Sequence, residues 1–295
     1  MGLRDWAIIV ILGIGWGMSF MFNAVLLREL DPLWISTGRV GFGALGCWIF
    51  LLGRGRRWQV SPGRALGLAG FGMLSYAAPF TFYAIGQQHI ASGVAGIVNA
   101  STPALAVLVT HFWPGGERAS WRKSLGVAAG IGGIVILSLP VLHAGEPSAI
   151  WAVCITLGAP LCYAFSVNVA RQFRAMESVV LVAWALTGAT LVMLPLAVQS
   201  EGLPPALSLQ AWGALAFIGF VLTSAAFIAM YWVLPRVGPT NITLPTLIAP
   251  TSALTLGVLV LDETLAPSHL LGLFAILFGL LLIDGRLFRR RVGVA

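Results

Sequence analysis

Charged side chains are scarce in this sequence: they make up 9% of its 295 residues, whereas hydrophobic ones make up 58%. Soluble globular domains carry about a quarter of their residues as Asp, Glu, Lys and Arg, so this scarcity excludes a chain that folds in water. The mean hydropathy of +0.93 agrees with that exclusion. The sequence therefore predicts a protein whose surroundings are mostly lipid.

Cysteine is also rare, and its three positions exclude two classes of site. Cys47, Cys154 and Cys162 lie in apolar runs without the CxxC or Cys/His spacing of a zinc site, and without the pattern of a disulfide framework. We expect buried, unreactive thiols at all three positions. We predict no metal and no cofactor.

The sequence motifs of common enzymes are missing as well. There is no HExxH, no GxSxG, no Walker loop and no acidic pair inside a hydrophobic run. All ten acidic residues lie at or between the ends of these runs, which leaves no buried carboxylate for a proton relay. We therefore predict that the chain is not an enzyme. An intramembrane enzyme acting on lipid is the alternative class, and a pore-forming or structural protein is the third.

Long hydrophobic runs are abundant, and charges, prolines and glycines divide them into ten. A hydrocarbon core of roughly 30 Å takes about 20 apolar residues as a helix, so the fold class predicted is an all-α integral membrane protein with ten transmembrane helices. The third and fourth runs are separated only by the short stretch from Gln87 to Ile90. The expected spans are 6–27, 33–53, 65–86, 91–113, 121–141, 149–170, 178–198, 209–234, 239–261 and 267–284.

The positive residues indicate how the ten spans are oriented. Fifteen of the 17 Lys and Arg fall on the side that holds both chain ends, Arg28 falls on the opposite side, and Arg39 lies inside a span. Cytoplasmic loops carry such an excess of positive charge. We expect a multi-pass protein of a bacterial-type inner (plasma) membrane with both termini cytoplasmic. Topology thus explains the net charge of +7, and nucleic acid is not an expected partner.

The second half of the sequence repeats residues of the first at an offset of 146 or 147 positions. A unit of five helices is inverted when it is duplicated, and inverted repeats are typical of alternating-access carriers. We expect residues 1–145 and 146–295 to form two inverted five-helix repeats around a central cavity. The matched residues are Glu117 with Glu263, Gly126 with Gly272, Gly133 with Gly279, Pro103 with Pro250, and Trp16-Gly17-Met18-Ser19-Phe20 with Tyr163-Ala164-Phe165-Ser166-Val167.

These residues resemble the drug/metabolite transporter superfamily, and within it the ten-helix EamA-type exporters. The likeness covers essentially the whole chain and also rests on Arg39, Thr102-Pro103 and Ala249-Pro250. It implies a basket of helices around a central cavity, with export of amino acids and related small metabolites as the commonest role. YddG-like exporters of aromatic and other neutral amino acids look closest in size and character.

Arg39 is the only positive residue well inside an expected span, where a charge is costly unless it is paired or hydrated. We expect it to face the interior. It is either a bidentate donor to a substrate carboxylate or a structural contact with helix-end carbonyls or Asp31. One buried cation is too little charge to hold a dianion, so neutral or zwitterionic solutes rank first.

Aromatic and polar residues within the spans are the other cavity candidates. A tyrosine brings a ring face and a hydroxyl that seeks a partner, and a buried Ser or Asn needs a partner, a water or a ligand. The competing interpretation is that they pack helices together. The predicted substrate-binding residues are Trp16, Ser19, Arg39, Tyr76, Tyr83, Asn99, Tyr163, Ser166 and Tyr231.

Two prolines and two glutamates are predicted to have structural or gating roles. Pro103 and Pro250 remove a backbone donor within the fourth and ninth spans, where we expect matching helix breaks. Glu117, which follows Gly116, and Glu263 lie at helix ends and are expected to contact helix N-termini across the repeat.

Together these observations predict an alternating-access transporter that exports small neutral metabolites, with amino acids, aromatic ones included, ranked first. A carrier of another metabolite or drug class in the same superfamily is the alternative. The expected partners are a small-molecule substrate and the lipid bilayer. Monomer and homodimer both stay open.

Overall fold

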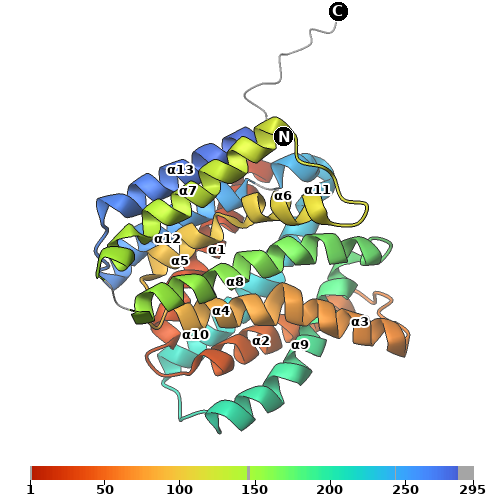
Figure 1. Ribbon diagram of the computed structural model, residues 1–295. Helices are drawn as coiled ribbons and strands as arrows, with labels where there is room; N and C mark the ends of the chain where they lie inside the picture. The colour runs from red at the N-terminus through yellow and green to blue at the C-terminus, as the bar shows by residue number, and fades with distance from the viewer. Residues whose placement is uncertain (1, 145–146, 243, 285–295) are drawn as a thin grey trace, which may run out of the picture.

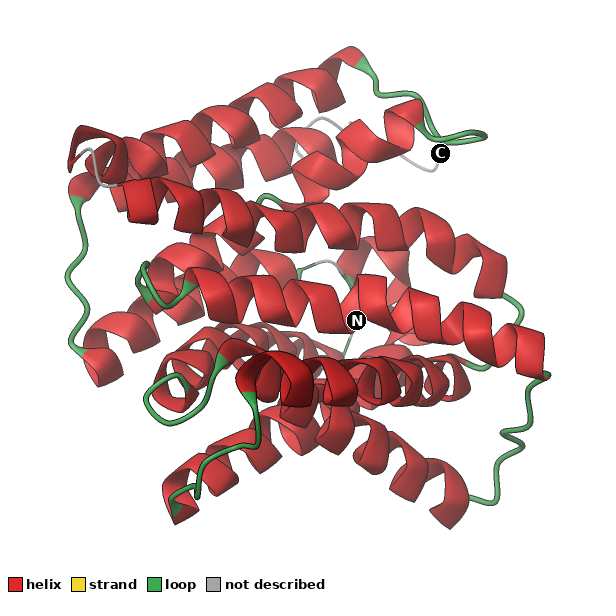
Figure 2. Cartoon of the chain, turned by 60° about the horizontal axis from the view of Figure 1, so that its bottom comes forward, coloured by secondary structure: helices red, strands yellow, loops and turns green. Residues whose placement is uncertain are grey.

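The computed structural model describes residues 2–144, 147–242 and 244–284. These ranges form a bundle of helices joined by short loops, with no strand among them (Figures 1 and 2). The helices are α1 Leu3–Leu26, α2 Pro32–Gly53, α3 Pro62–Gly72, α4 Ala78–Gly86, α5 Ser92–Asn99, α6 Thr102–Phe112, α7 Trp121–Ala144, α8 Pro147–Val169, α9 Ser178–Glu201, α10 Leu209–Gly219, α11 Ala226–Asn241, α12 Pro245–Leu261 and α13 Pro267–Asp284; the shorter segments are π-helical η1 Met73–Ala77 and η3 Phe220–Ala225, and 3-10 helical η2 Ala170–Phe173.

The predicted all-α fold with ten membrane-crossing segments is confirmed. In the described ranges, nine helical segments are long and apolar enough to cross a membrane, and α12 is a shorter apolar helix of 17 residues. The third span runs from Pro62 to Gly86 and the fourth from Ser92 to Phe112, so the division after Gly86 is correct. The chain is a multi-pass membrane protein.

The eighth span ends at Gly238, whose φ of 77° interrupts α11, so the ninth span is separated from it close to its expected start at residue 239. The helix α12 then begins at Pro245. Proline suits a helix start because the first N–H groups of a helix have no partner within it. The Gly238 kink and Pro245 therefore fix the boundary better than hydrophobicity does.

Only one of the two helix breaks expected at prolines is present. The fourth span is interrupted between Asn99 and Thr102, and Pro103 lies in the first turn of α6. The matching break expected at Pro250 was wrong, because α12 continues through that residue. Proline inside a membrane helix is tolerated when neighbouring groups satisfy the backbone around it.

The cysteines were expected to be buried, and this holds only for Cys47. Cys154 is exposed and Cys162 is half-buried. Both belong to α8, whose outward residues face the surroundings of the bundle. In lipid an apolar thiol on the outer face meets no penalty, so hydrophobicity alone does not predict burial.

Irregular backbone recurs at the same offset as the matched residues. The segments η1 and η3 begin at Met73 and Phe220, 147 positions apart, in the third and eighth spans. Gly115 and Asp262, also 147 positions apart, have left-handed φ values of 68° and 55°. The chain is thus folded as two inverted five-helix repeats. The expected boundary at residues 145 and 146 lies outside the described residues.

The two halves interlock along their length. The fifth and tenth spans, α7 and α13, lie side by side in Figure 1, and α2 packs on α9. Glycines form the α7/α13 contact reciprocally. A Cβ added to Gly133 would lie 2.7 Å from the carbonyl oxygen of Gly272, and one added to Gly126 would lie 2.6 Å from that of Gly279. The repeated glycines are therefore needed for close approach of two backbones.

We predict that Gly133→Ala lowers the melting temperature of the purified protein in detergent. The new methyl group would meet backbone, which yields less readily than a side chain, and overpacking of this kind costs about 1–3 kcal/mol. Gly132→Ala is the matched control, since a Cβ there meets nothing within 4 Å. Equal melting temperatures for the two variants would contradict the assigned contact.

Candidate functional site

A cavity of about 360 Å³ lies between the two halves, and residues of both η1 and η3 contribute to its wall. Such π-helical segments occur often at functional sites, where they alter the direction of side chains. All nine residues that the sequence predicted as cavity candidates line this cavity, although their role in binding stays a prediction. The wall also includes Phe20, Phe71, Ser75, Phe80, Thr102, Val167, Ala170, Leu222, Phe227 and Thr246.

Arg39 lies in the cavity wall and is only 6% exposed. Its Nε donates to Thr223 Oγ1 and its Nη2 to Ser19 Oγ, both at 3.2 Å. The guanidinium also lies 3.7 Å from the centroid of the Phe80 ring. Arg39 forms no ion pair with any described residue, so the alternative contact with Asp31 is not made. The arginine is a buried cation held by two hydroxyls and an aromatic ring, all of them uncharged.

Aromatic rings fix much of the remaining wall. Tyr83 lies edge-on to Phe20 with ring centroids 5.1 Å apart, and Tyr76 lies edge-on to Phe227 at 5.3 Å. The Tyr83 hydroxyl donates to Asn99 Oδ1 at 2.7 Å, at the break in the fourth span. Rings held in this way give a rigid, largely apolar surface with a few polar groups, which is typical of small-molecule sites.

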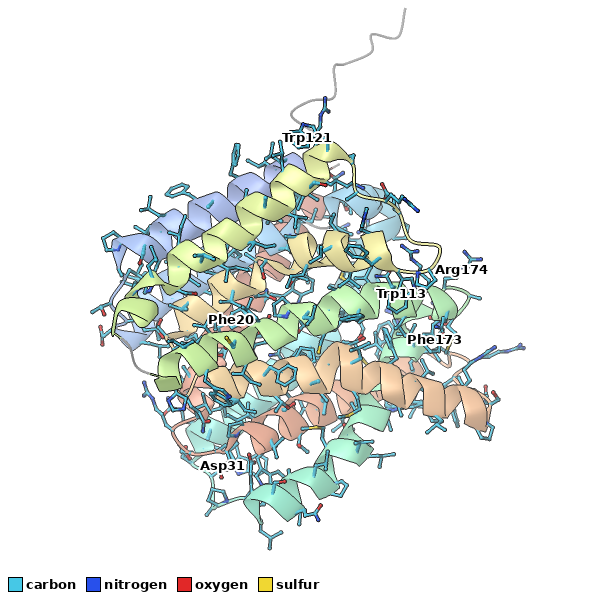
Figure 3. The ribbon with its side chains drawn as sticks, viewed as in Figure 1. Phe20, Asp31, Trp113, Trp121, Phe173 and Arg174 are labelled. Carbon is cyan, nitrogen blue, oxygen red and sulfur yellow. The ribbon has the colours of Figure 1, made fainter. Side chains whose placement is uncertain are left out.

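The bundle has two ends that differ in structure. Figure 3 labels Asp31 at one end and Trp113 and Arg174 at the other. We call these the Asp31 end and the Arg174 end. Toward the Asp31 end, buried Asn23 donates to Gln87 Oε1 at 3.3 Å, and Gln87 Nε2 donates to the carbonyl of Phe20 at 2.8 Å. These bonds join α1 to the end of the third span beside Phe20, which lines the cavity.

Three glutamates at the Asp31 end each cross between the halves to accept hydrogen bonds from backbone N–H groups at a helix start. A carboxylate there satisfies donors that have no partner within the helix, and it meets the positive end of the helix dipole. The bonds from Ser208 also lower the pKa of Glu29. The pairs are Glu263 with Ser92 and Gly93 at 2.6 and 3.0 Å, Glu201 with Leu33 and Trp34 at 3.0 and 3.1 Å, and Glu29 with Ser208 at 2.9 Å.

Different contacts hold the Arg174 end. Arg56 pairs with Glu177 at 3.7 Å and Arg236 with Asp5 at 2.9 Å, and both pairs join the two halves. Glu117 pairs with Lys123, and its side chain is 72% exposed. Lys123 lowers the pKa of that carboxyl. Among the described residues, Glu117 does not make the predicted contact with a helix N-terminus, whereas Glu263 does. Ala170, which corresponds to buried Asn23 at the repeat offset, lines the cavity. The cavity thus extends toward the Arg174 end.

The sequence did not identify Phe80, which stacks on the guanidinium of Arg39. One phenylalanine in an apolar run carries no signal by itself. Its counterpart Phe227, 147 positions later, also lines the cavity, so the repeat offset could have identified both. The bond between Asn23 and Gln87 was also not predicted, although Asn23 is a polar residue inside the first expected span and Gln87 directly follows the third.

Comparison with known proteins relates the chain to transporters. The model of the EamA-like transporter family matches residues 6–139 and 150–284. The uncharacterized transporter YoaV of Bacillus subtilis is 23% identical over 288 residues, which cover 94% of this chain and 95% of that protein. A probable terminal-alkyne amino-acid exporter of Streptantibioticus cattleyicolor is 24% identical over 207 residues, which cover 70% of this chain and 68% of that protein. A solved crystal structure has the same fold, with a TM-score of 0.67 at 18% identity, and the match covers 98% of this chain and 99% of that one.

We predict that Thr223→Val destabilises the protein by about 1.5–3 kcal/mol, because a buried charge loses a hydrogen-bond acceptor. Thr190→Val is the matched control: its hydroxyl donates to the Leu186 carbonyl at 2.7 Å, as that of Thr223 does to Ile218 at 2.9 Å, without contacting Arg39. Thermal unfolding in detergent measures both. Equal losses would show that Thr223 does not stabilise the guanidinium.

Proposed function

We propose that this chain, which belongs to the EamA-like transporter family, exports small neutral metabolites, with amino acids, aromatic ones included, as the first candidates. The observation that carries the proposal is a cavity of about 360 Å³ with aromatic walls and a buried guanidinium. Ligand sites of this kind are concave, mostly apolar and marked by a few placed polar groups. The relative named as a probable amino-acid exporter supports the same substrate class.

Arg39 is the proposed contact for the substrate carboxylate. Its bonds to Thr223 and Ser19 use two of its N–H groups, and the others can donate to a carboxylate. Trp16 and Tyr163, which match across the repeat, would hold the apolar part of the solute from opposite halves. In this proposal the chain transports its solute unchanged and has no enzymatic activity.

We propose that, during alternating access, the contacts at one end of the bundle break while those at the other end form. The Asp31 end is held by Glu263 on Ser92 and Gly93, whereas Glu117 at the Arg174 end is exposed. In an inner membrane with cytoplasmic termini, the Arg174 end faces the cytoplasm, so this conformation would load its solute from the cell. Release outward would then require Glu263 to leave α5 and the Arg174 end to close. Pro103, beside the break in the fourth span, would serve as a hinge residue.

The first test is efflux from liposomes loaded with labelled aromatic or aliphatic amino acids. We expect saturable efflux from the wild type and at least about tenfold slower efflux from Arg39→Ala and Tyr163→Ala, since each removes a contact with the bound solute. Arg28→Ala is the control, because it removes a positive charge outside the cavity. Traces equal to those of empty vesicles for every amino acid would overturn this substrate class.

The second test measures hydrogen exchange in the peptide that contains Ser92 and Gly93. Glu263→Ala removes the acceptor of both N–H groups, so we expect faster deuterium uptake there. Glu117→Ala is the matched control, because its exposed carboxylate lies at the other end of the bundle. Unchanged uptake in Glu263→Ala would rule out this carboxylate as the contact that holds the Asp31 end.

A further inference from the structure

The wall of the cavity carries a full positive charge and no negative one. Arg39 is the charged residue of its lining, and no Asp or Glu of the described ranges lines it. The carboxylates that form ion pairs in these ranges, Asp5, Glu117 and Glu177, pair with surface cations instead. The site is therefore unbalanced by one unit of charge.

A buried guanidinium held only by hydroxyls and a ring is incompletely compensated. Two hydrogen bonds of 3.2 Å and the Phe80 ring at 3.7 Å replace only part of the water that a cation loses on burial. A ligand with one carboxylate would supply the missing charge, and it would do so in the bidentate geometry that guanidinium favours. The cavity is thus complementary to a monoanion.

The ammonium group of an amino acid, by contrast, has no anionic partner in this cavity. The amide oxygen Asn99 Oδ1 would be an acceptor, but it already accepts from the Tyr83 hydroxyl at 2.7 Å and from Thr102 Oγ1 at 3.4 Å. The hydroxyls of Ser19 and Thr223 accept from Arg39 itself. The hydroxyl of Ser75, which has no partner among the described residues, would be a neutral acceptor only. An ammonium would therefore exchange its water for uncharged acceptors and also repel the guanidinium.

We propose that the preferred solute is a hydrophobic monocarboxylate that lacks an ammonium group, with its carboxylate on Arg39 and its aromatic or similarly sized body between the rings of Tyr76, Tyr163 and Phe227. This inference rests on the transport function proposed above and changes its preferred solute from a neutral, zwitterionic one to an anion of similar shape. Each cycle would carry one negative charge outward, and an inside-negative membrane potential would drive it without a proton relay.

Three phenylalanine-like solutes of nearly equal shape test the charge preference in liposome efflux: 3-phenyllactate, phenylalanine and phenylalaninamide. The first is a monoanion, the second a zwitterion, and the third lacks the carboxylate. We expect kcat/KM for 3-phenyllactate to exceed that for phenylalanine by about tenfold or more, and that for phenylalaninamide to be lowest. Protein-free vesicles give the background leak of each solute.

The outcomes separate this inference from the proposed function. If phenylalanine leaves as fast as 3-phenyllactate or faster, the monoanion preference is wrong and export of neutral amino acids stands. If neither solute leaves faster than from protein-free vesicles, export of aromatic solutes is wrong, and the inference is overturned with it.

Two further measurements test whether Arg39 and the net charge of the solute cause the preference for 3-phenyllactate over phenylalanine. Arg39→Gln should lower the rate ratio of 3-phenyllactate to phenylalanine by about tenfold, whereas Arg28→Gln should leave the ratio unchanged. In the wild type, an inside-negative potassium diffusion potential set with valinomycin should accelerate efflux of 3-phenyllactate more than that of phenylalanine. An equal voltage effect on both solutes would contradict electrogenic transport of an anion, even if Arg39→Gln fails to fold.

Discussion

Lipid offers no hydrogen-bonding partner to a backbone group or a charge. This constraint determines where the chain is helical and where its backbone is irregular. The segments that cross the membrane are helical, so their backbone N–H and C=O groups form hydrogen bonds within the same helix. The main departures lie beside the cavity: η1 and η3 contribute to its wall, and the break from Asn99 to Thr102 places two polar residues in it. Irregular backbone is thus concentrated where a solute or water could replace the missing partners.

The same constraint separates closely packed helix contacts, such as α7 with α13, from the polar residues around the cavity. At α7/α13 the reciprocal contacts of Gly126 with Gly279 and Gly133 with Gly272 leave no room for a side chain. At the cavity, Arg39 relies on uncharged partners, and different contacts hold the two ends. Because the halves are related by inversion, each contact at one end has a counterpart position at the other. The residues at these positions can differ, as Ala170 differs from Asn23, so a second conformation would be held by partly different contacts.

Topology and the repeat could be read from the sequence because both are encoded in long patterns. Ten apolar runs and alternating loop charge predicted the spans, and the offset of 146 or 147 residues predicted the inverted halves. Arg39 was recognisable because a charge in an apolar run is rare. The start of α12 at Pro245, the straight passage through Pro250 and the bond between Asn23 and Gln87 depend on tertiary contacts, which a linear pattern does not contain. Phe80 was missed because its importance comes from the guanidinium stacked on it.

If one cavity opens to each side of the membrane in turn, a cysteine in its wall can be reached from both sides, and Ser75 is the best position for it. Ser75 lines the cavity, is 6% exposed, and its hydroxyl has no hydrogen-bond partner among the described residues, so Ser75→Cys is a mild change. With Cys47, Cys154 and Cys162 replaced by alanine, an impermeant thiol reagent would be applied separately to each side of oriented vesicles. We expect labelling from both sides, slowed in each case by a transported solute. Labelling from one side only, with or without solute, would contradict alternating access.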